Sequence, residues 1–262
     1  MYAFEYHRPQ SVADAAKLLA GNGEAKLLAG GHTLIPTMKQ RLANPPVLID
    51  LARVSELRGI DRKGSALVIG AMTTHDEVAG SSVVRGAIAG LCEVAGSIGD
   101  PHVRNRGTIG GSVANNDPAA DYPAAVLALG ATIASNKREI AADDFFKGLY
   151  QTALNDGEVI TAVSFPVPEK AGWQKFRQPA SRFALVGVFV AKGKGGVRAA
   201  VTGAGASGVF RAKALEDKLA ANWSGSACDG VKIDASGLNS DLHGSAEYRA
   251  ALIPVLAKRA IG

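Results

Sequence analysis

Two glycine pairs constrain the fold of this chain more than any other feature of its sequence: Gly30-Gly31 and, 80 residues later, Gly110-Gly111. A glycine has no Cβ, so another segment or a bound group can approach its backbone closely. The first pair separates a strand-like segment, residues 25–29, from a helix-like one, residues 32–42. Such a turn leaves amide N–H groups unpaired and pointing one way, which suits an anion such as phosphate. Taken alone, it is equally compatible with an ordinary tight turn.

The second glycine pair has hydroxyl side chains on both sides, Thr108 and Ser112, which can donate to a phosphate or a ribityl chain. Asp121 follows in a stretch rich in Asn, Asp and Pro, and its carboxylate can accept hydrogen bonds from sugar hydroxyls. A turn followed by a loop would explain this segment equally well. Two such segments together nevertheless fit a diphosphate held from two sides in an extended dinucleotide site. The glycine spacing matches neither the Rossmann nor the P-loop pattern.

Length and composition indicate a globular protein with one large or two modest domains: 262 residues, 47% of them hydrophobic and 20% charged. The longest apolar run, residues 124–134, contains Gly130 and Thr132 and is too short to span a bilayer. The first nine residues lack the apolar core of a signal peptide. We therefore expect a cytoplasmic protein without a transmembrane segment, with a peripheral position at the inner face of the membrane as an alternative.

Charge and cysteine content limit the chemistry. The formal net charge is +5 without any run of basic residues, which favours an anionic partner or cofactor but not nucleic acid. Cys92 and Cys228 are the only cysteines, too few for an iron–sulfur cluster or a structural zinc site. No His, Asp and Glu residues have metal-ligand spacing, and no nucleophile–histidine arrangement is recognisable. Redox chemistry in this chain would therefore need an organic cofactor, with no metal site and no catalytic side chain.

Hydrophobic periodicity predicts a mixed first part and a second part of strands followed by helices, an α+β fold. Pro166-Val-Pro168 is the best linker candidate. The expected helices cover residues 12–19, 32–42, 83–98, a segment from 123, 211–221 and 245–261. The expected strands cover residues 25–29, 47–50, 66–72, 131–134, 158–165, 173–177, 185–192 and 197–202.

Three motifs carry a resemblance to a known family: Ala29-Gly-Gly-His-Thr-Leu34, Thr108-Ile-Gly-Gly-Ser112 and Asn116-Asp-Pro-Ala-Ala-Asp-Tyr-Pro123. In this order and spacing they resemble the FAD-binding medium subunit of molybdenum hydroxylases, of the carbon monoxide dehydrogenase and xanthine dehydrogenase type. The resemblance runs nearly end to end. It implies a two-part FAD-binding domain of the PCMH/vanillyl-alcohol-oxidase type over residues 1–167, with subdomains of approximately 1–55 and 56–167. A small domain with an antiparallel sheet and helices would follow over residues 168–262.

The resemblance also implies which residues hold the cofactor. Asp121 matches an acidic residue that binds ribityl or ribose hydroxyls, and Ile160 falls where the main chain contacts the flavin ring. Arg177 falls at a position that is commonly lysine, near the pyrimidine edge of the ring, where a cation stabilises the reduced flavin. The first loop would wrap the FAD diphosphate and comprises Leu28, Ala29, Gly30, Gly31, His32, Thr33 and Leu34. The second would lie on the opposite side of the diphosphate and comprises Thr108, Ile109, Gly110, Gly111 and Ser112.

The function implied by the resemblance is electron exit from a larger enzyme. FAD would bind noncovalently here, while molybdopterin lies in a large subunit and [2Fe-2S] clusters lie in a small subunit, in a dimer of heterotrimers. The electron acceptor stays open between NAD, a quinone and a soluble carrier. Two alternatives remain: a stand-alone FAD-dependent oxidoreductase, and a non-catalytic nucleotide-binding assembly module.

Overall fold

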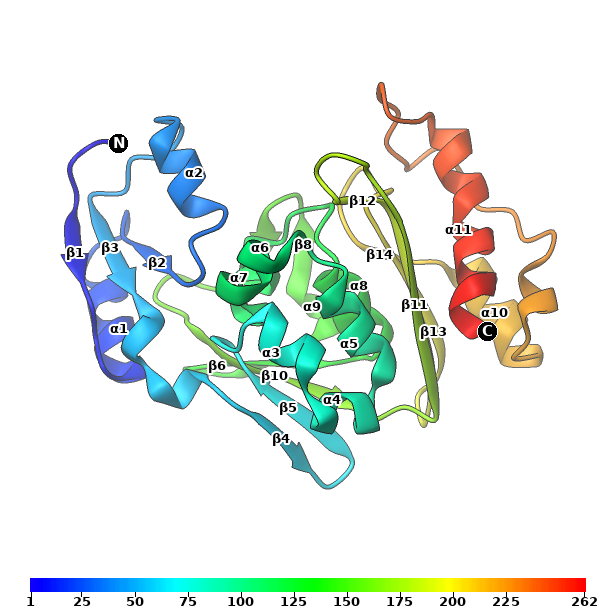
Figure 1. The fold of residues 1–262 in the computed structure, drawn as a ribbon, viewed down its shortest axis with the longest axis horizontal. Coiled ribbons are helices and arrows are strands. Elements are labelled where there is room, and N and C mark those ends of the chain that lie inside the picture. Colours follow the sequence, from blue (N-terminus) through cyan, green and yellow to red (C-terminus); the bar gives the residue numbers. More distant parts are fainter.

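Three β-sheets follow one another across the molecule, the N-terminal one on the left of Figure 1 and the C-terminal one on the right. The structure is a computed structural model and describes residues 1–262. Helices pack beside each sheet, so the fold belongs to the α+β class expected from the sequence. No helix has the length and apolar character that a membrane-spanning segment requires.

The N-terminal lobe is a three-stranded parallel sheet with two α-helices. Its strands lie in the order β1 (Glu5–His7), β3 (Val47–Asp50) and β2 (Lys26–Leu28). The central strand, β3, is buried along its whole length. The helices and 3₁₀ turns of this lobe are α1 (Val12–Ala20), α2 (Leu34–Lys39), η1 (Leu51–Arg53) and η2 (Ser55–Leu57). Helix α2 is shorter than the expected 32–42, because the first loop continues to Thr33 before the helix begins.

The central sheet is antiparallel and has five strands in the order β4-β5-β10-β6-β7. Val163 in the middle strand pairs with Ile69 on one side and Ile133 on the other, and all three side chains are fully buried. The five strands are β4 (Ile60–Lys63), β5 (Ala66–Gly70), β10 (Ile160–Pro166), β6 (Thr132–Ser135) and β7 (Glu139–Ala141). A two-stranded hairpin, β8 (Phe146–Gly148) and β9 (Gln151–Thr152), lies beside it.

Short helices lie between the central and C-terminal sheets (Figure 1). The single helix expected over residues 83–98 is wrong, because the chain turns out of helical geometry at Ile88 (φ −146°, ψ 79°), whose side chain is buried in the core. Residues 109–115 form a helix where the sequence suggested a turn. The helices are α3 (His75–Gly80), α4 (Ser82–Ala87), α5 (Ala89–Gly96), α6 (Pro101–Arg106), α7 (Ile109–Asn115), α8 (Tyr122–Ala128) and α9 (Ala142–Phe145).

The C-terminal sheet is antiparallel, in the order β11 (Lys170–Arg177), β12 (Ala184–Gly193), β13 (Gly196–Thr202) and β14 (Phe210–Arg211). Helices α10 (Lys213–Ala221) and α11 (Ala246–Ile261) pack on one face, with the 3₁₀ turn η3 (Gly225–Cys228) beside them. Helices α5 and α8 pack on the other face. Four side chains of the sheet therefore belong to the same hydrophobic cluster as the central sheet: Trp173, Phe189, Ala191 and Ala200.

Candidate functional site

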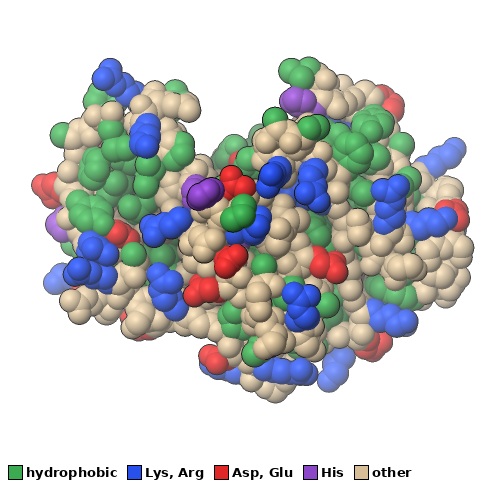
Figure 2. All heavy atoms as spheres, viewed as in Figure 1, with side chains coloured by type: hydrophobic (Ala, Val, Ile, Leu, Met, Phe, Trp, Pro, Cys, Tyr) green, Lys and Arg blue, Asp and Glu red, His purple; other side chains and the backbone are tan.

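A cleft of about 860 Å³ is lined by residues of all three sheets and of the helices between them. Figure 2 shows the surface deeply hollowed between the N-terminal lobe and the rest of the molecule, with charged side chains and a histidine along the edge. The cleft is large and partly apolar, with a few convergent polar groups, as is typical of a cofactor site.

Nearly all of the residues that the sequence singled out line this one cleft. The exceptions are Ile109, whose side chain is fully buried in the core, and Arg177, which is exposed at the end of β11. The residues brought together are Leu28, Ala29, Gly30, Gly31, His32, Thr33, Leu34, Thr108, Gly110, Gly111, Ser112, Asp121 and Ile160.

The first loop presents a row of free amides. Six consecutive backbone N–H groups, from Ala29 to Leu34, donate no hydrogen bond to any atom of the chain. The loop can turn here because Gly31 has a φ of +78°, which side chains with a Cβ rarely adopt. Unpaired backbone donors at the surface are satisfied by water or by a bound acceptor. This loop is therefore ready to bind the oxygen atoms of an anion.

The two glycine segments touch each other. A Cβ on Gly30 would lie 2.7 Å from the Cα of Gly107, so only glycine lets the first loop approach this closely. A Cβ on Gly111 would lie 3.4 Å from the Cβ of Ala29. The segments around residues 30 and 110 thus form adjoining walls of one cleft, although they are 80 residues apart in the sequence.

The second segment differs from the expectation in its hydrogen bonds. Four of its five amides are already used within the chain: those of Ile109 and Gly110 donate to Thr73 and Ala71, and those of Gly111 and Ser112 both donate to Thr108. These bonds form because residues 109–115 are helical and dock against the Ala71–Thr73 turn. The second segment therefore offers close approach, the Ser112 hydroxyl and the single free amide of Thr108, whereas the row of free amides comes from the first loop.

A buried ion pair lies deeper in the cleft. The Lys175 ammonium on β11 donates to Asp121 Oδ2 at 2.6 Å and to the Ser97 carbonyl at 3.1 Å, and both charged side chains are only 4% exposed. Burial raises the pKa of the Asp121 carboxyl to about 6, although the Lys175 charge opposes that shift. The other oxygen, Oδ1, is buried without a hydrogen-bond partner. An acceptor is thus left for a donor from outside the chain, as a sugar hydroxyl would be.

His75 forms part of the same wall and is uncharged at neutral pH. Burial, together with the charges of His32 and Arg104, lowers the pKa of its imidazole to about 4. Its ring lies 5.3 Å from that of Tyr122, and burial also raises the pKa of this phenol. Neither His75 Nδ1 nor the Tyr122 hydroxyl has a hydrogen-bond partner.

The rim of the cleft joins the C-terminal sheet to the helical layer. The guanidinium groups of Arg104 and Arg182 both donate to the Gly99 carbonyl, at 3.3 Å and 3.2 Å. Two half-exposed aromatic side chains, Tyr150 and Phe183, also line the cleft. The hydroxyl of Tyr150 donates to Asp117 at 3.2 Å. The rim therefore combines positive charge with aromatic surface, both of which suit an anionic aromatic ligand.

No group of three or more His, Cys, Asp or Glu side chains could hold a metal ion. Both cysteines are buried, at 4% and 2% exposure for Cys92 and Cys228. Burial raises the pKa of each thiol, so both remain protonated at neutral pH.

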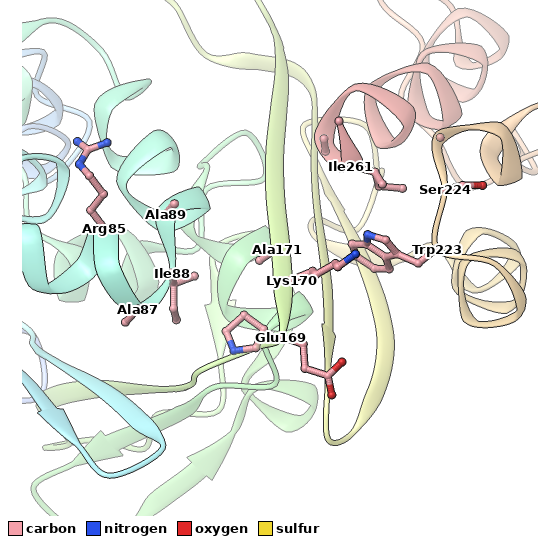
Figure 3. Close-up of a pocket in the computed structure, with 14 residues that line it drawn as sticks. Arg85, Ala87, Ile88, Ala89, Glu169, Lys170, Ala171, Trp223, Ser224 and Ile261 are labelled. Atoms are coloured by element: carbon pink, nitrogen blue, oxygen red, sulfur yellow. The ribbon is translucent and has the colours of Figure 1, made fainter.

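A second cavity, of about 730 Å³, lies between helix α4 and the C-terminal end of α11. Figure 3 shows Arg85 and Ile88 on one side and Trp223 and Ile261 on the other, with Lys170 between them. Its charged side chains are exposed, and none of its lining residues has a buried polar side-chain atom without a hydrogen-bond partner. It thus has none of the unsatisfied polar groups that mark the first cleft.

The sequence did not single out His75 or Lys175 as members of the site. The alternation of β11 holds a usable signal for Lys175: it lies two residues after the buried Trp173 and so on the same face of the strand. Trp173 donates to the side chain of Ser97, and Lys175 donates to its carbonyl. For His75 the sequence showed a first-turn position in α3, but nothing about the packing of that helix against Tyr122.

The chain is similar to known proteins over most of its length. A sequence model of the family described as "FAD binding domain in molybdopterin dehydrogenase" matches residues 2–168. The carbon monoxide dehydrogenase medium chain of Hydrogenophaga pseudoflava is 38% identical, over 98% of this chain and 96% of the relative. The nicotine 6-hydroxylase medium subunit of Paenarthrobacter nicotinovorans is 35% identical, over 99% and 96%.

The fold comparison leads to the same family. A solved structure of carbon monoxide dehydrogenase from Hydrogenophaga pseudoflava, in a form that lacks the Mo-pyranopterin moiety, superposes with a TM-score of 0.90. The similarity covers 99% of this chain and 96% of the other, at 38% identity. Sequence, fold and cleft agree: the chain belongs to the family of FAD-binding subunits of molybdopterin-dependent dehydrogenases and hydroxylases.

Proposed function

We propose that the chain binds FAD noncovalently in the cleft and passes electrons from iron–sulfur clusters of a partner subunit to an external acceptor. The observation that carries this proposal is the juxtaposition of six free amides with an unpaired, buried Asp121 oxygen in one cleft. The amides suit the diphosphate and the carboxylate suits a ribityl hydroxyl. FAD supplies the chemistry, because it accepts electrons singly from clusters and delivers them in pairs.

Backbone amides and side chains of this protein together hold and orient the cofactor. The first loop, from Leu28 to Leu34, binds the diphosphate through its amides. Gly111 and Ser112 close the opposite side. Asp121 accepts from the ribityl chain and Ile160 contacts the flavin ring through its main chain. Arg177 lies outside the cleft lining, at the exposed end of β11. No general acid or base in this chain is needed for electron transfer.

The clusters and the molybdenum centre belong to partner subunits in this proposal. Two buried cysteines cannot ligate an iron–sulfur cluster, so electrons must arrive from another chain. A small iron–sulfur subunit and a large molybdopterin subunit, assembled as a dimer of heterotrimers in the cytoplasm, would complete the enzyme. The relatives act on carbon monoxide and on nicotine, according to their names, so the substrate is chosen outside this chain.

We also propose a division into two domains, residues 1–167 and 168–262, the first with parts of approximately 1–55 and 56–167. The match of the family model to residues 2–168 supports the boundary. The cleft nevertheless draws on both domains, because Lys175, Arg182 and Phe183 line it from beyond that boundary.

Purification of the full chain tests the function. We expect a visible flavin spectrum, release of FAD on acid precipitation, and co-purification of iron–sulfur and molybdenum-containing chains. A colourless protein that binds no added FAD would support the assembly module instead. Oxidation of an organic substrate by the isolated chain would support the stand-alone oxidoreductase.

A matched pair of glycine variants tests the first loop. Gly31→Ala and Gly64→Ala both place a Cβ on a residue with positive φ, but only Gly31 lines the cleft. Both variants should lose stability from backbone strain, and Gly31→Ala somewhat more, because its Cβ would lie 2.7 Å from Cδ1 of Ile35, which must move aside. Only Gly31→Ala should lose FAD affinity, which fluorescence titration measures. Equal FAD affinity in the two variants would contradict the role of the first loop.

A further inference from the structure

Lys175 is the most buried basic side chain of the cleft lining, at 4% exposure, and it belongs to the C-terminal sheet. Its ammonium group has three N–H donors, of which two are bonded to Asp121 and Ser97. The third donor has no partner in the chain, and neither has Asp121 Oδ1. The pair therefore has one free donor and one free acceptor, and both of its residues line the cleft.

The charges around this pair are nearly balanced. Lys175 and Asp121 neutralise each other at 2.6 Å, with both side chains 4% exposed. His75 and Tyr122, the other titratable side chains packed in this wall, are neutral at pH 7. Arg177 contributes a weaker field, because its side chain is exposed to solvent and lies outside the cleft lining. Loss of Asp121 would thus leave one full positive charge in a poorly screened place, and loss of Lys175 would leave one negative charge wherever the pH keeps Asp121 ionised.

We propose that Lys175, held in place by Asp121, is the cation that stabilises the reduced flavin, and that the Asp121 carboxylate moderates its effect. This inference rests on the proposed function and departs from the assignment of that role to Arg177. A cation beside the flavin stabilises the negative charge that the ring gains on reduction. Since Asp121 neutralises most of the Lys175 charge, the pair keeps the flavin potential between the value expected with Lys175 alone and the value expected with Asp121 alone. Single substitutions at the two positions measure these two values.

The two single variants should shift the flavin potential in opposite directions. Asp121→Asn leaves the ammonium without a counter-charge, so the ratio of affinities for reduced over oxidised flavin should rise at least tenfold. Lys175→Met removes the cation and raises the pKa of the buried Asp121 further, so the same ratio should fall, and the fall should reach at least tenfold in alkaline buffer, where Asp121 is ionised. Each tenfold change corresponds to about 30 mV for a two-electron couple. The double variant removes both charges and should return to within about threefold of the unsubstituted protein.

Dye-equilibration titration of the full, FAD-loaded chain measures these potentials without any enzymatic turnover. Arg177→Gln and Lys175→Arg are the matched controls, and both should stay within a threefold change in the ratio. Shifts of the two single variants in the same direction, or a double variant that does not return, would overturn the proposal. So would a larger effect from Arg177→Gln than from Lys175→Met.

Separate outcomes identify a failure of the proposed function or of folding. If the unsubstituted chain binds no FAD, the proposed function itself is wrong, whereas normal FAD binding with unchanged potentials refutes only the role of the pair. If one single variant loses FAD, the other single variant must still shift the flavin potential in its expected direction, and the absence of that shift overturns the proposal. Thermal unfolding of each variant shows whether its fold is retained, because a buried unpaired charge destabilises the fold.

Discussion

Gly111→Val should separate cofactor binding from folding. A Cβ at residue 111 would lie 3.4 Å from the Cβ of Ala29 and 3.0 Å from Thr108 Oγ1. The first distance is ordinary van der Waals contact, so the two additional methyl groups of valine would fill the space between the two loops. Overpacking of this kind typically costs about 1–3 kcal/mol. We therefore expect the dissociation constant of FAD to rise by about 5-fold to 100-fold, since a factor of ten corresponds to about 1.4 kcal/mol.

The fold itself should suffer little from this change. Residue 111 lies inside helix α7, where valine is better than glycine by a few tenths of a kcal/mol. The tight contact with Thr108, the N-cap residue of α7, opposes this gain by at most about 1 kcal/mol. The free energy of unfolding of the FAD-free chain should thus change by less than about 1 kcal/mol.

Two further glycines calibrate this experiment. Gly86 lies in helix α4, and its Cβ would meet nothing within 4 Å, so Gly86→Val should keep both FAD and stability. A Cβ on Gly110 would lie 2.7 Å from the Ala71 carbonyl oxygen, so Gly110→Ala should instead destabilise the fold. Fluorescence titration with FAD and urea unfolding of the FAD-free chains measure the two effects. A normal FAD content in Gly111→Val would remove the second segment from the site.

Three further predictions concern stability. The pKa of His75 is lowered from 6.5 to about 4, so as pH falls the unfolded chain takes up a proton on this residue before the folded chain does. The free energy of unfolding therefore keeps its full value above pH 6.5 and falls by about 3 kcal/mol in total toward pH 4. His75→Phe should therefore flatten the pH dependence of urea unfolding in that range, and an unchanged slope would contradict the buried neutral imidazole. Arg249→Met should destabilise the chain by about 3 kcal/mol or more in the same assay, because the carbonyls of Leu185 and Gly203 lose their buried charged donor. A loss below about 1 kcal/mol would show that water replaces this donor. Thr74→Ala should cost about 1 kcal/mol through loss of a capping box, measured by thermal unfolding, and an unchanged midpoint would refute this.

Local patterns predicted the regular elements well where one face is apolar. The expected strands at 47–50 and 197–202 and the expected helix at 12–19 agree with β3, β13 and α1 to within about two residues. The break at Ile88 was missed because both flanking segments are helical in pattern, and tertiary packing of α5 on β11 sets their relative direction. A Cβ on Gly90 would lie 3.4 Å from the Cα of Gly172, in ordinary van der Waals contact, so α5 packs closely on β11 at this point.

The cleft was predicted less completely than the fold. Glycine pairs and hydroxyls are visible in the sequence, so the segments that meet around Gly30 and Gly111 could be proposed from the chain alone. The sequence does not show which amides remain free, because this depends on the docking of α7 against the Ala71–Thr73 turn. The partner of Asp121 was missed for a similar reason: Lys175 is 54 residues away in the sequence and reaches it across the contact between the helical layer and the C-terminal sheet.

The hydrophobic cluster shared between the central and C-terminal sheets affects how the cleft can move. Trp173 and Phe189 are packed into the same apolar interior as the helices that carry Asp121 and Gly111, so these walls should shift together as one rigid block. The N-terminal lobe has an apolar interior largely of its own, centred on Ile49 and Leu57. Opening of the cleft to admit or release a large cofactor would then come from movement of the N-terminal lobe. This movement would carry the row of free amides away from the other walls of the cleft, which would stay in place.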